Sequence, residues 1–330
     1  MLKRLILIAA ILVEGFGVSV QANDSVAEIG AGGVMLGRND LIRLEREDLA
    51  ISADLVTVDY VFVNESDTDI ETIVAFPMPA IQAEYDSAIS VPEQQNDNFL
   101  GFSVELDGRA IVPKLDQRAV AAGVDVTGDL AERGIPLLPV ADETRSALGR
   151  LPADVLADWT ARGIVQSQTY DAGKGPVTEV IARWELRSAY WWTARFPAGK
   201  AVSVSHRYRP AVGASAGLNF IWDDQRSDFY DEYARKYCMD DAFERAVRRK
   251  LAAGGAWEQR IDYILTSGGN WANGVIGTFH LTVDKGATNT LVSFCGTGVE
   301  KTGPTRFEMT AKDFYPEKDI HILLVQPAAQ

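Results

Sequence analysis

The sequence predicts a mainly β fold, with two β-sandwich-like domains and helical insertions at about residues 128–163 and 227–251. Short runs of alternating apolar and polar residues recur along most of the chain, separated by clusters of Gly, Pro, Asn and Asp. Only the two insertions have the three-to-four-residue spacing of helices. We therefore expect an N-terminal sandwich domain over 23–213, and a helix plus a C-terminal sandwich domain over 214–330.

The first 22 residues have the composition of a secretory signal peptide. A positive start, Met-Leu-Lys-Arg, precedes an apolar run over 5–13, and Val-Gln-Ala at 20–22 places small residues where a signal peptidase cleaves. Glu14 interrupts the apolar run, whereas a spanning helix needs about 20 apolar residues. We predict cleavage after Ala22 and a periplasmic or secreted protein without a membrane span in the mature chain. The alternative is an uncleaved N-terminal anchor.

The mature chain is strongly acidic. The whole sequence has 32 basic and 46 acidic residues, and the leader holds Lys3, Arg4 and Glu14, which leaves 30 and 45 and a net charge of −15. Such a surface repels nucleic acid and anionic lipid, so we expect no nucleic-acid partner.

The N-terminal strands begin with a polar-rich run over 41–51, which we predict to be an edge strand or hairpin arm. The stretch DYVFVNESDTDIETIVAFPMP, 59–79, continues a strand that begins at Val56 and alternates with a period of two. Its polar centre, 64–69, is rich in turn-forming residues, and a return strand follows. Proline cannot donate to a ladder, so pairing should end at Pro77.

The remaining elements follow the same signals. Asp107-Gly108 predicts a tight hairpin turn. The stretch 227–251 reads as one helix, with Asp240 or Asp241 as an N-cap within it and Gly254 after its end. Further strands are expected over 99–106, 109–112, 177–210, 261–265, 275–283, 290–294, 306–311 and 320–325.

Two cysteines, Cys238 and Cys295, are 57 positions apart. An even count in an exported protein predicts a disulfide. Two buried free thiols are the alternative. We expect no metal site and no cofactor, because two cysteines without CxxC spacing and three histidines supply too few ligands.

Several segments of the chain resemble those of a bacterial exported family catalogued as domain of unknown function 4424. The resemblance extends over essentially the whole mature chain and implies no particular reaction, since none is assigned to that family. Its segments are NDSVAEIGAGGVML after the leader, the strand-turn-strand-FPMP run, FPAGKAVSVSHRYRPAVG, YCMDD, IGTFHLTVDKG, LVSFCG and GPTRFEMTAKDFYPEKDI.

A second resemblance covers only about residues 56–119. The aromatic-rich strand, the Asn-containing turn, the return strand with a Phe-Pro-x-Pro stop and the later hairpin are similar to the vault and inter-alpha-trypsin type β-domain. That family implies an interaction or structural role beside adhesion modules. This chain departs from the pattern, because it has no Asp-x-Ser-x-Ser stretch for a metal-ion adhesion site.

The first candidate contact residues lie in two strands. Trp191 and Trp192 point to opposite faces, so one could stack on a sugar or a partner while the other is buried; both could equally be covered. His206, Arg207 and Arg209 could bind an anion such as phosphate or carboxylate, or could be ordinary strand residues on alternating faces.

A second candidate group is acidic: Asp223, Asp224, Asp228, Asp231 and Glu232. Such oxygens suit a hard cation, but the spacing is not that of an EF-hand loop. A pair of them could serve as general acid and base in a glycosidase. The alternative is a solvated loop and helix N-terminus, where carboxylates are favourable.

No catalytic motif is present, so we predict a non-catalytic protein that binds a ligand or interacts with an envelope protein or glycan. The first alternative is an envelope glycan or peptide hydrolase that uses carboxylates of 223–232. The second is a small-anion binding protein at Arg207 and Arg209. If the FPMP run has a functional part, we expect it at 77–80 and in the loop after it, where the backbone is free of sheet pairing.

Overall fold

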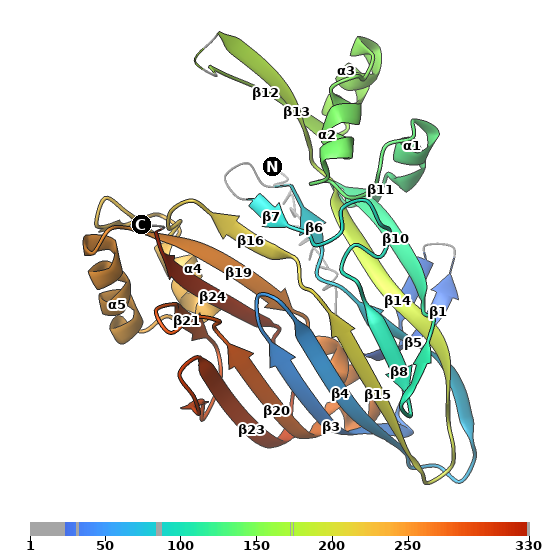
Figure 1. Ribbon diagram of the computed structural model, residues 1–330. Helices are drawn as coiled ribbons and strands as arrows, with labels where there is room; N and C mark the ends of the chain where they lie inside the picture. The colour runs from blue at the N-terminus through green and yellow to red at the C-terminus, as the bar shows by residue number, and fades with distance from the viewer. Residues whose placement is uncertain (1–23, 31–32, 84–87, 172, 174, 329–330) are drawn as a thin grey trace, which may run out of the picture.

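The structure is a computed structural model that describes residues 24–30, 33–83, 88–171, 173 and 175–328. It is mainly β with few helices, as predicted (Figure 1). The predicted signal peptide, 1–22, lies outside the described residues. None of the helices in the described part of the chain is long and apolar enough to cross a membrane.

Three sheets form the body of the molecule. The seven-stranded sheet has the order β11 (Val124–Asp125), β10 (Lys114–Ala121), β14 (Glu185–Phe196), β5 (Ile70–Pro77), β1 (Ser25–Gly30), β2 (Gly33–Leu36), with β6 (Ile81–Gln82) also on β14. The eight-stranded sheet has the order β22 (Glu300–Lys301), β23 (Arg306–Phe314), β20 (Ile276–Asp284), β3 (Ile42–Ile51), β4 (Val56–Asn64), β15 (Ala201–Tyr208), β8 (Ser103–Leu106), β9 (Arg109–Ile111). The five-stranded sheet has the order β21 (Leu291–Phe294), β24 (Ile320–Pro327), β19 (Ala256–Tyr263), β16 (Val212–Ser215), β7 (Ala88–Ser90).

Smaller elements complete the chain. The hairpin β12–β13 projects from the body beside the first three helices (Figure 1). The short pair β17–β18 precedes the last two helices in the sequence. Their bounds are β12 (Val165–Asp171), β13 (Pro176–Ala182), β17 (Ile221–Trp222), β18 (Gln225–Arg226), α1 (Thr127–Glu132), α2 (Asp142–Leu148), α3 (Ala153–Ala161), α4 (Tyr230–Tyr237), α5 (Asp241–Ala252), and the 3₁₀ turns η1 (Thr266–Asn270) and η2 (Ala272–Gly274).

The two strands of the stretch 59–79 lie in different sheets. β4 pairs within the eight-stranded sheet, and β5 within the seven-stranded one. The turn between them crosses from one sheet to the other, and Asn64 holds it by donating from Nδ2 to the Thr68 carbonyl and the Phe196 carbonyl, each at 2.8 Å. β5 ends at Pro77 as predicted. The stretch is therefore an arch between two layers.

Aromatic side chains fill the space between these two sheets. Phe62 on β4 contacts Phe196 on β14, with ring centroids 5.9 Å apart. The five-stranded sheet joins the same core through Tyr263, whose hydroxyl is 3.1 Å from that of Tyr60. One continuous cluster of buried apolar residues therefore includes strands from all three sheets.

Strand β24 of the five-stranded sheet is buried on both faces. Ile322 and Leu324 on β24 belong to the main core, whereas the alternate residues Leu323 and Val325 pack with α4 and α5. This division follows from the period of two along a strand. It also explains why β24 is a nearly continuous apolar run, which is typical of a strand covered on both sides.

Strand β3 is one arm of a hairpin with β4, which confirms one of the two predicted alternatives, and it is an inner strand, so the other alternative, an edge strand, is wrong. It lies between β4 and β20, and it pairs with β20 in parallel. Its outer face carries most of the polar residues, and the exception, Glu47, is buried and accepts a hydrogen bond from the Tyr263 hydroxyl. A bulge at Glu45 bends it toward Gly277 on β20, where a Cβ atom would lie 2.7 Å from the Glu45 carbonyl oxygen. Glycine is therefore required at that position.

The two segments predicted as separate sandwich domains share a sheet and a core. β20 and β23, from the C-terminal segment, extend the eight-stranded sheet that β3 and β4 begin. The predicted boundary between residues 213 and 214 lies inside β16.

Both helical insertions are present. α1, α2 and α3 occupy the first and pack around Trp159 and Trp184. The second is broken into α4 and α5, because Cys238 takes a left-handed conformation at φ 52° and ends α4. Asp240 then caps α5 by accepting a 2.7 Å hydrogen bond from the Phe243 backbone N–H, as its predicted N-cap role requires.

Candidate ligand-binding site

A cavity of about 170 Å³ lies where the segment after β5 approaches β16, β19 and the end of α4. Residues 79–82 form part of its wall, which places the loop singled out in the sequence beside this space. Three charged side chains, Lys236, Arg260 and Asp262, also line it. The other lining residues are Ile89, Leu100, Tyr208, Pro210, Ala211 and Gly213.

Strand β19 positions the charged residues by its period of two. Glu258, Arg260 and Asp262 lie on one face, toward α4, whereas Ile261 and Tyr263 point into the main core. The alternation Glu-x-Arg-x-Asp was visible in the sequence, but sequence reasoning missed it because it did not show what would cover that face.

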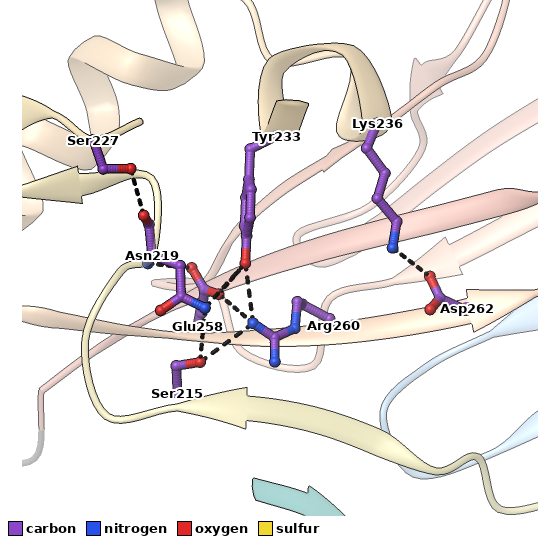
Figure 2. A network of polar contacts seen from close by, with 8 residues as sticks. All are labelled: Ser215, Asn219, Ser227, Tyr233, Lys236, Glu258, Arg260 and Asp262. Atoms are coloured by element: carbon purple, nitrogen blue, oxygen red, sulfur yellow. Dashed lines mark hydrogen bonds and ion pairs between the residues drawn. The ribbon is translucent and has the colours of Figure 1, made fainter. Parts of the chain in front are cut away.

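A buried ion pair anchors Arg260 (Figure 2). Glu258 is completely buried, and its Oε1 accepts from Arg260 Nη1 at 2.7 Å and from the Tyr233 hydroxyl at 2.8 Å. Arg260 Nη1 also donates to Ser215 Oγ at 3.2 Å. The Asn219 backbone N–H donates to the other Glu258 oxygen at 3.1 Å. Burial raises the pKa of Glu258, and these hydrogen bonds oppose that shift.

Asp262 and Lys236 form a second, looser pair. His321 Nδ1 lies 2.6 Å from Asp262 Oδ1, and because a carboxylate only accepts, this nitrogen carries the proton. Lys236 Nζ is 3.7 Å from the same oxygen, and it makes no hydrogen bond to any residue that the structure describes. Burial would raise the pKa of Asp262, but the His321 hydrogen bond and the Lys236 charge lower it.

The predicted disulfide is present and fixes the end of α4. Cys238 and Cys295 are bonded, with Cα atoms 5.0 Å apart, so the residue after α4 is tied to the residue after β21. Ser293 Oγ adds a 3.0 Å hydrogen bond to the Tyr237 carbonyl. The bond therefore holds Lys236, two residues earlier, at the cavity wall.

Two of the predicted contact residues are core residues. His206 is 1% exposed and lies among the rings of Tyr60, Phe76, Phe102 and Trp192. Trp192 is itself buried. Burial lowers the pKa of His206 to about 3, so the imidazole is neutral at neutral pH.

The other three lie nearer the surface, and the structure does not bring them together in a pocket. Trp191 is half-buried under Lys114, whose ammonium is 4.4 Å from the indole centroid. Arg207 and Arg209 are exposed on the strand face opposite His206, and Arg209 pairs with Glu93 at 2.9 Å. Neither arginine lines the cavity, so the small-anion site predicted from them has no pocket there.

The five predicted carboxylates are all exposed. Asp223 and Asp224 form the turn between β17 and β18, and the others lie before or within the first turn of α4. None of the five lines the cavity. In the part of the chain that the structure describes, no cluster of three or more His, Cys, Asp or Glu residues could hold a metal ion.

Glu244 on α5 is the carboxylate that forms ion pairs and hydrogen bonds with β18 and α4, and sequence reasoning missed it. It accepts from Arg226 and from the Tyr230 hydroxyl, each at 2.6 Å, and from Arg248 at 2.7 Å. The Arg226 hydrogen bond is the main reason that its pKa falls to about 2, although burial opposes the shift. These contacts join α5 to α4 and to β18.

Glu244→Gln is expected to lower the free energy of unfolding at pH 7 by about 2 kcal/mol, after a discount for the exposure of Arg226. The pKa is lower in the folded state, so this stabilisation is complete above pH 4.5 and is lost as the pH falls toward 2. Urea unfolding at pH 7, 4 and 3 measures it. The exposed Glu232→Gln change is the control, and equal effects of the two variants at pH 7 would contradict the prediction.

A larger groove of about 830 Å³ lies between α2, β13 and β16. Its charged residues, Asp142, Arg145 and Glu179, are ion-paired with one another, and none of them is buried. It has no counterpart of the Glu258–Arg260 pair. The smaller cavity is therefore the better candidate, because fixed polar groups converge there.

Comparison with known proteins gave one family and a remote structural likeness. The family described as "Domain of unknown function (DUF4424)" matches residues 22–323. No curated protein matches the chain. A solved structure from Legionella pneumophila subsp. pneumophila str. Philadelphia 1, described as a "putative nutrient binding protein", has a TM-score of 0.40 and 13% sequence identity. That likeness covers 91% of this chain and 72% of the other.

Proposed function

This chain belongs to the family described as domain of unknown function DUF4424, and within it we propose that the protein is an exported, non-catalytic binding protein. Its ligand would be a small polar molecule held in the cavity beside β19. The observation that carries the proposal is a cavity whose charged wall is fixed by the buried Glu258–Arg260 pair. Pre-organised polar groups in a partly apolar cavity are typical of small-molecule sites.

Two further features support the proposal. The leader-like composition of residues 1–22 favours export to the periplasm. The Cys238–Cys295 disulfide suits that oxidising compartment.

The cavity size limits the ligand. Ligand sites for drug-sized molecules measure about 300–1,000 Å³, whereas this one measures about 170 Å³. The cavity therefore suits a ligand smaller than a drug-sized molecule.

Filling the cavity is expected to abolish binding. Ala80 is exposed and lines the wall, so Ala80→Trp places an indole at the cavity without disturbing the core. A panel of amino acids, sugars, carboxylates, amines and inorganic phosphate would be tested by thermal shift. At 100 times its Kd, a ligand stabilises the folded protein by about 2.7 kcal/mol. The wild-type chain and the exposed control Ala110→Trp should show this shift, and Ala80→Trp should not.

Two results would overturn the proposal. One is that no compound in the panel shifts the wild-type chain. The other is that Ala80→Trp responds as fully as Ala110→Trp. Mass spectrometry of the bound compound tests the non-catalytic part, because a ligand recovered chemically altered would indicate a reaction.

A further inference from the structure

The charges at the cavity wall form two neutral pairs. Arg260 is balanced by Glu258, which is completely buried and does not line the cavity. Lys236 and Asp262 balance one another, and both line it. A ligand therefore meets Lys236 and Asp262 side by side, and the third charged group at the wall, Arg260, is already neutralised from behind by Glu258.

The second pair retains hydrogen-bonding capacity on both sides. The Lys236 ammonium has three donor protons and lies 3.7 Å from Asp262 Oδ1, beyond hydrogen-bond distance. Asp262 Oδ1 takes the His321 hydrogen bond, and Oδ2 accepts none from any residue that the structure describes. An unused donor and an unused acceptor thus lie next to each other at the wall.

A zwitterion matches this arrangement. In an α-amino acid the ammonium nitrogen and the carboxyl carbon are about 2.5 Å apart, as bond lengths of about 1.5 Å and a tetrahedral angle require. Set against the Lys236–Asp262 pair in the opposite sense, the ligand carboxylate would accept from Lys236 while its ammonium donates to Asp262. Charge-assisted hydrogen bonds of this kind are about twice as strong as neutral ones.

The rest of the cavity selects against simple anions. The protein carries a net charge of −14, which repels free anions but not a molecule of zero net charge. Pro79 and Pro210 line the wall and have no N–H to offer to phosphate oxygens. Ile81 and Leu100 supply apolar surface for a short side chain.

We propose that the ligand of this cavity is a small α-amino acid, with its carboxylate on Lys236, its ammonium on Asp262 and a short apolar side chain against Ile81 and Leu100. This rests on the proposed function, and it adds the chemical class. The volume of about 170 Å³ has room for a small amino acid such as alanine.

Isothermal titration with matched compounds tests the class. The probes are L-alanine, D-alanine, propionate, which lacks the ammonium, and ethylamine, which lacks the carboxylate. At least one alanine enantiomer should bind, and propionate and ethylamine should each bind at least tenfold more weakly, because each loses one charge-assisted pair.

Two variants assign the roles. Lys236→Gln should weaken alanine at least tenfold and leave ethylamine unchanged, whereas Asp262→Asn should weaken alanine at least tenfold and leave propionate unchanged or tighter. The exposed changes Lys318→Gln and Asp54→Asn are the matched controls and should leave alanine binding unaltered. Melting curves of all four variants confirm that each is folded.

The outcomes separate the two proposals. If propionate or ethylamine binds as tightly as alanine, or if either cavity variant binds alanine normally, the amino-acid assignment is overturned. If alanine fails to bind but another compound of the panel binds and Ala80→Trp abolishes that binding, the assignment falls and the binding function stands. If nothing binds, both fall.

Discussion

Replacing Cys238 and Cys295 by serine is expected to lower the free energy of unfolding by about 4 kcal/mol. The disulfide closes a loop between residues 57 positions apart, and removing it gives the unfolded chain back the conformations that the loop excludes. The loop spans α5, β19 and β20, so the restraint acts on the face that carries the cavity. The loss should extend to binding, because α4 positions Lys236 and Tyr233.

Urea unfolding of the oxidised wild type and of the double serine variant measures the difference. Adding a reductant should lower the stability of the wild type to that of the variant and leave the variant unchanged. A difference below 1 kcal/mol would show that the loop restraint contributes little. Alanine titration of the same two proteins tests whether the end of α4 holds the site in place.

Asp24→Asn is expected to make the fold sensitive to acid, with a loss of about 3 kcal/mol between pH 7 and pH 4. The cause is His206, whose pKa falls to about 3 on burial, while an unfolded histidine titrates near 6.5. As the pH falls below 6.5, the unfolded chain takes up a proton that the folded chain excludes, so stability decreases. Each pH unit in this range changes the free energy of unfolding by about 1.4 kcal/mol.

In the wild type, Asp24 opposes this loss. Its carboxylate lies 3.5 Å from His206 Nε2, and burial raises its pKa well above the usual value. A raised pKa means that acid favours the folded state, the opposite sign to His206. Over much of this pH range the stability gained from Asp24 therefore offsets the stability lost through His206. Replacing Asp24 removes the gain and leaves only the loss.

A double variant isolates the effect. The double variant with Asp24→Asn and His206→Phe should not show the 3 kcal/mol loss of unfolding free energy between pH 7 and pH 4. It has no imidazole to titrate, and the phenyl ring keeps the packing among Phe76, Phe102 and Trp192. Urea midpoints at pH 7, 6, 5 and 4 for the single and double variants give the comparison. Parallel pH profiles of the two variants would show that His206 is not the responsible group.

Local patterns predicted the strands well, and pairings between distant segments poorly. The alternation from Val56 and the proline stop at Pro77 identified β4 and β5, because a strand's side-chain period is a local property. Their separation into two sheets depends on the Asn64 contact with Phe196, more than a hundred residues away. The polar content of 41–51 likewise suggested an edge strand or a hairpin arm. The hairpin with β4 is local and is present, whereas the second partner, β20, lies over two hundred residues later and was missed.

The site shows the same limit. Arg207 and Arg209 were predicted as an anion site because they are close in sequence, but both lie at the surface. Glu258, Arg260 and Asp262 alternate as visibly, but their importance depends on α4, which covers that strand face with Tyr233 and Lys236. The disulfide was predictable because composition alone argued for it. The break at Cys238 was missed, because a left-handed residue leaves no signal in helical spacing.

The parallel pairing of β3 with β20 has a consequence for how the chain acquires its structure. Residues 42–51 can complete their pairing only when residues 276–284 are available. The middle of the largest sheet therefore forms by closing a very long loop of chain. Contacts of such separation slow folding. A fragment that ends near residue 213 would leave one edge of β3 open to pairing with other chains. If the chain crosses a membrane from its N-terminus, it can complete this sheet only after most of its length has emerged. A chaperone that covers β3 until then would therefore raise the yield of folded protein.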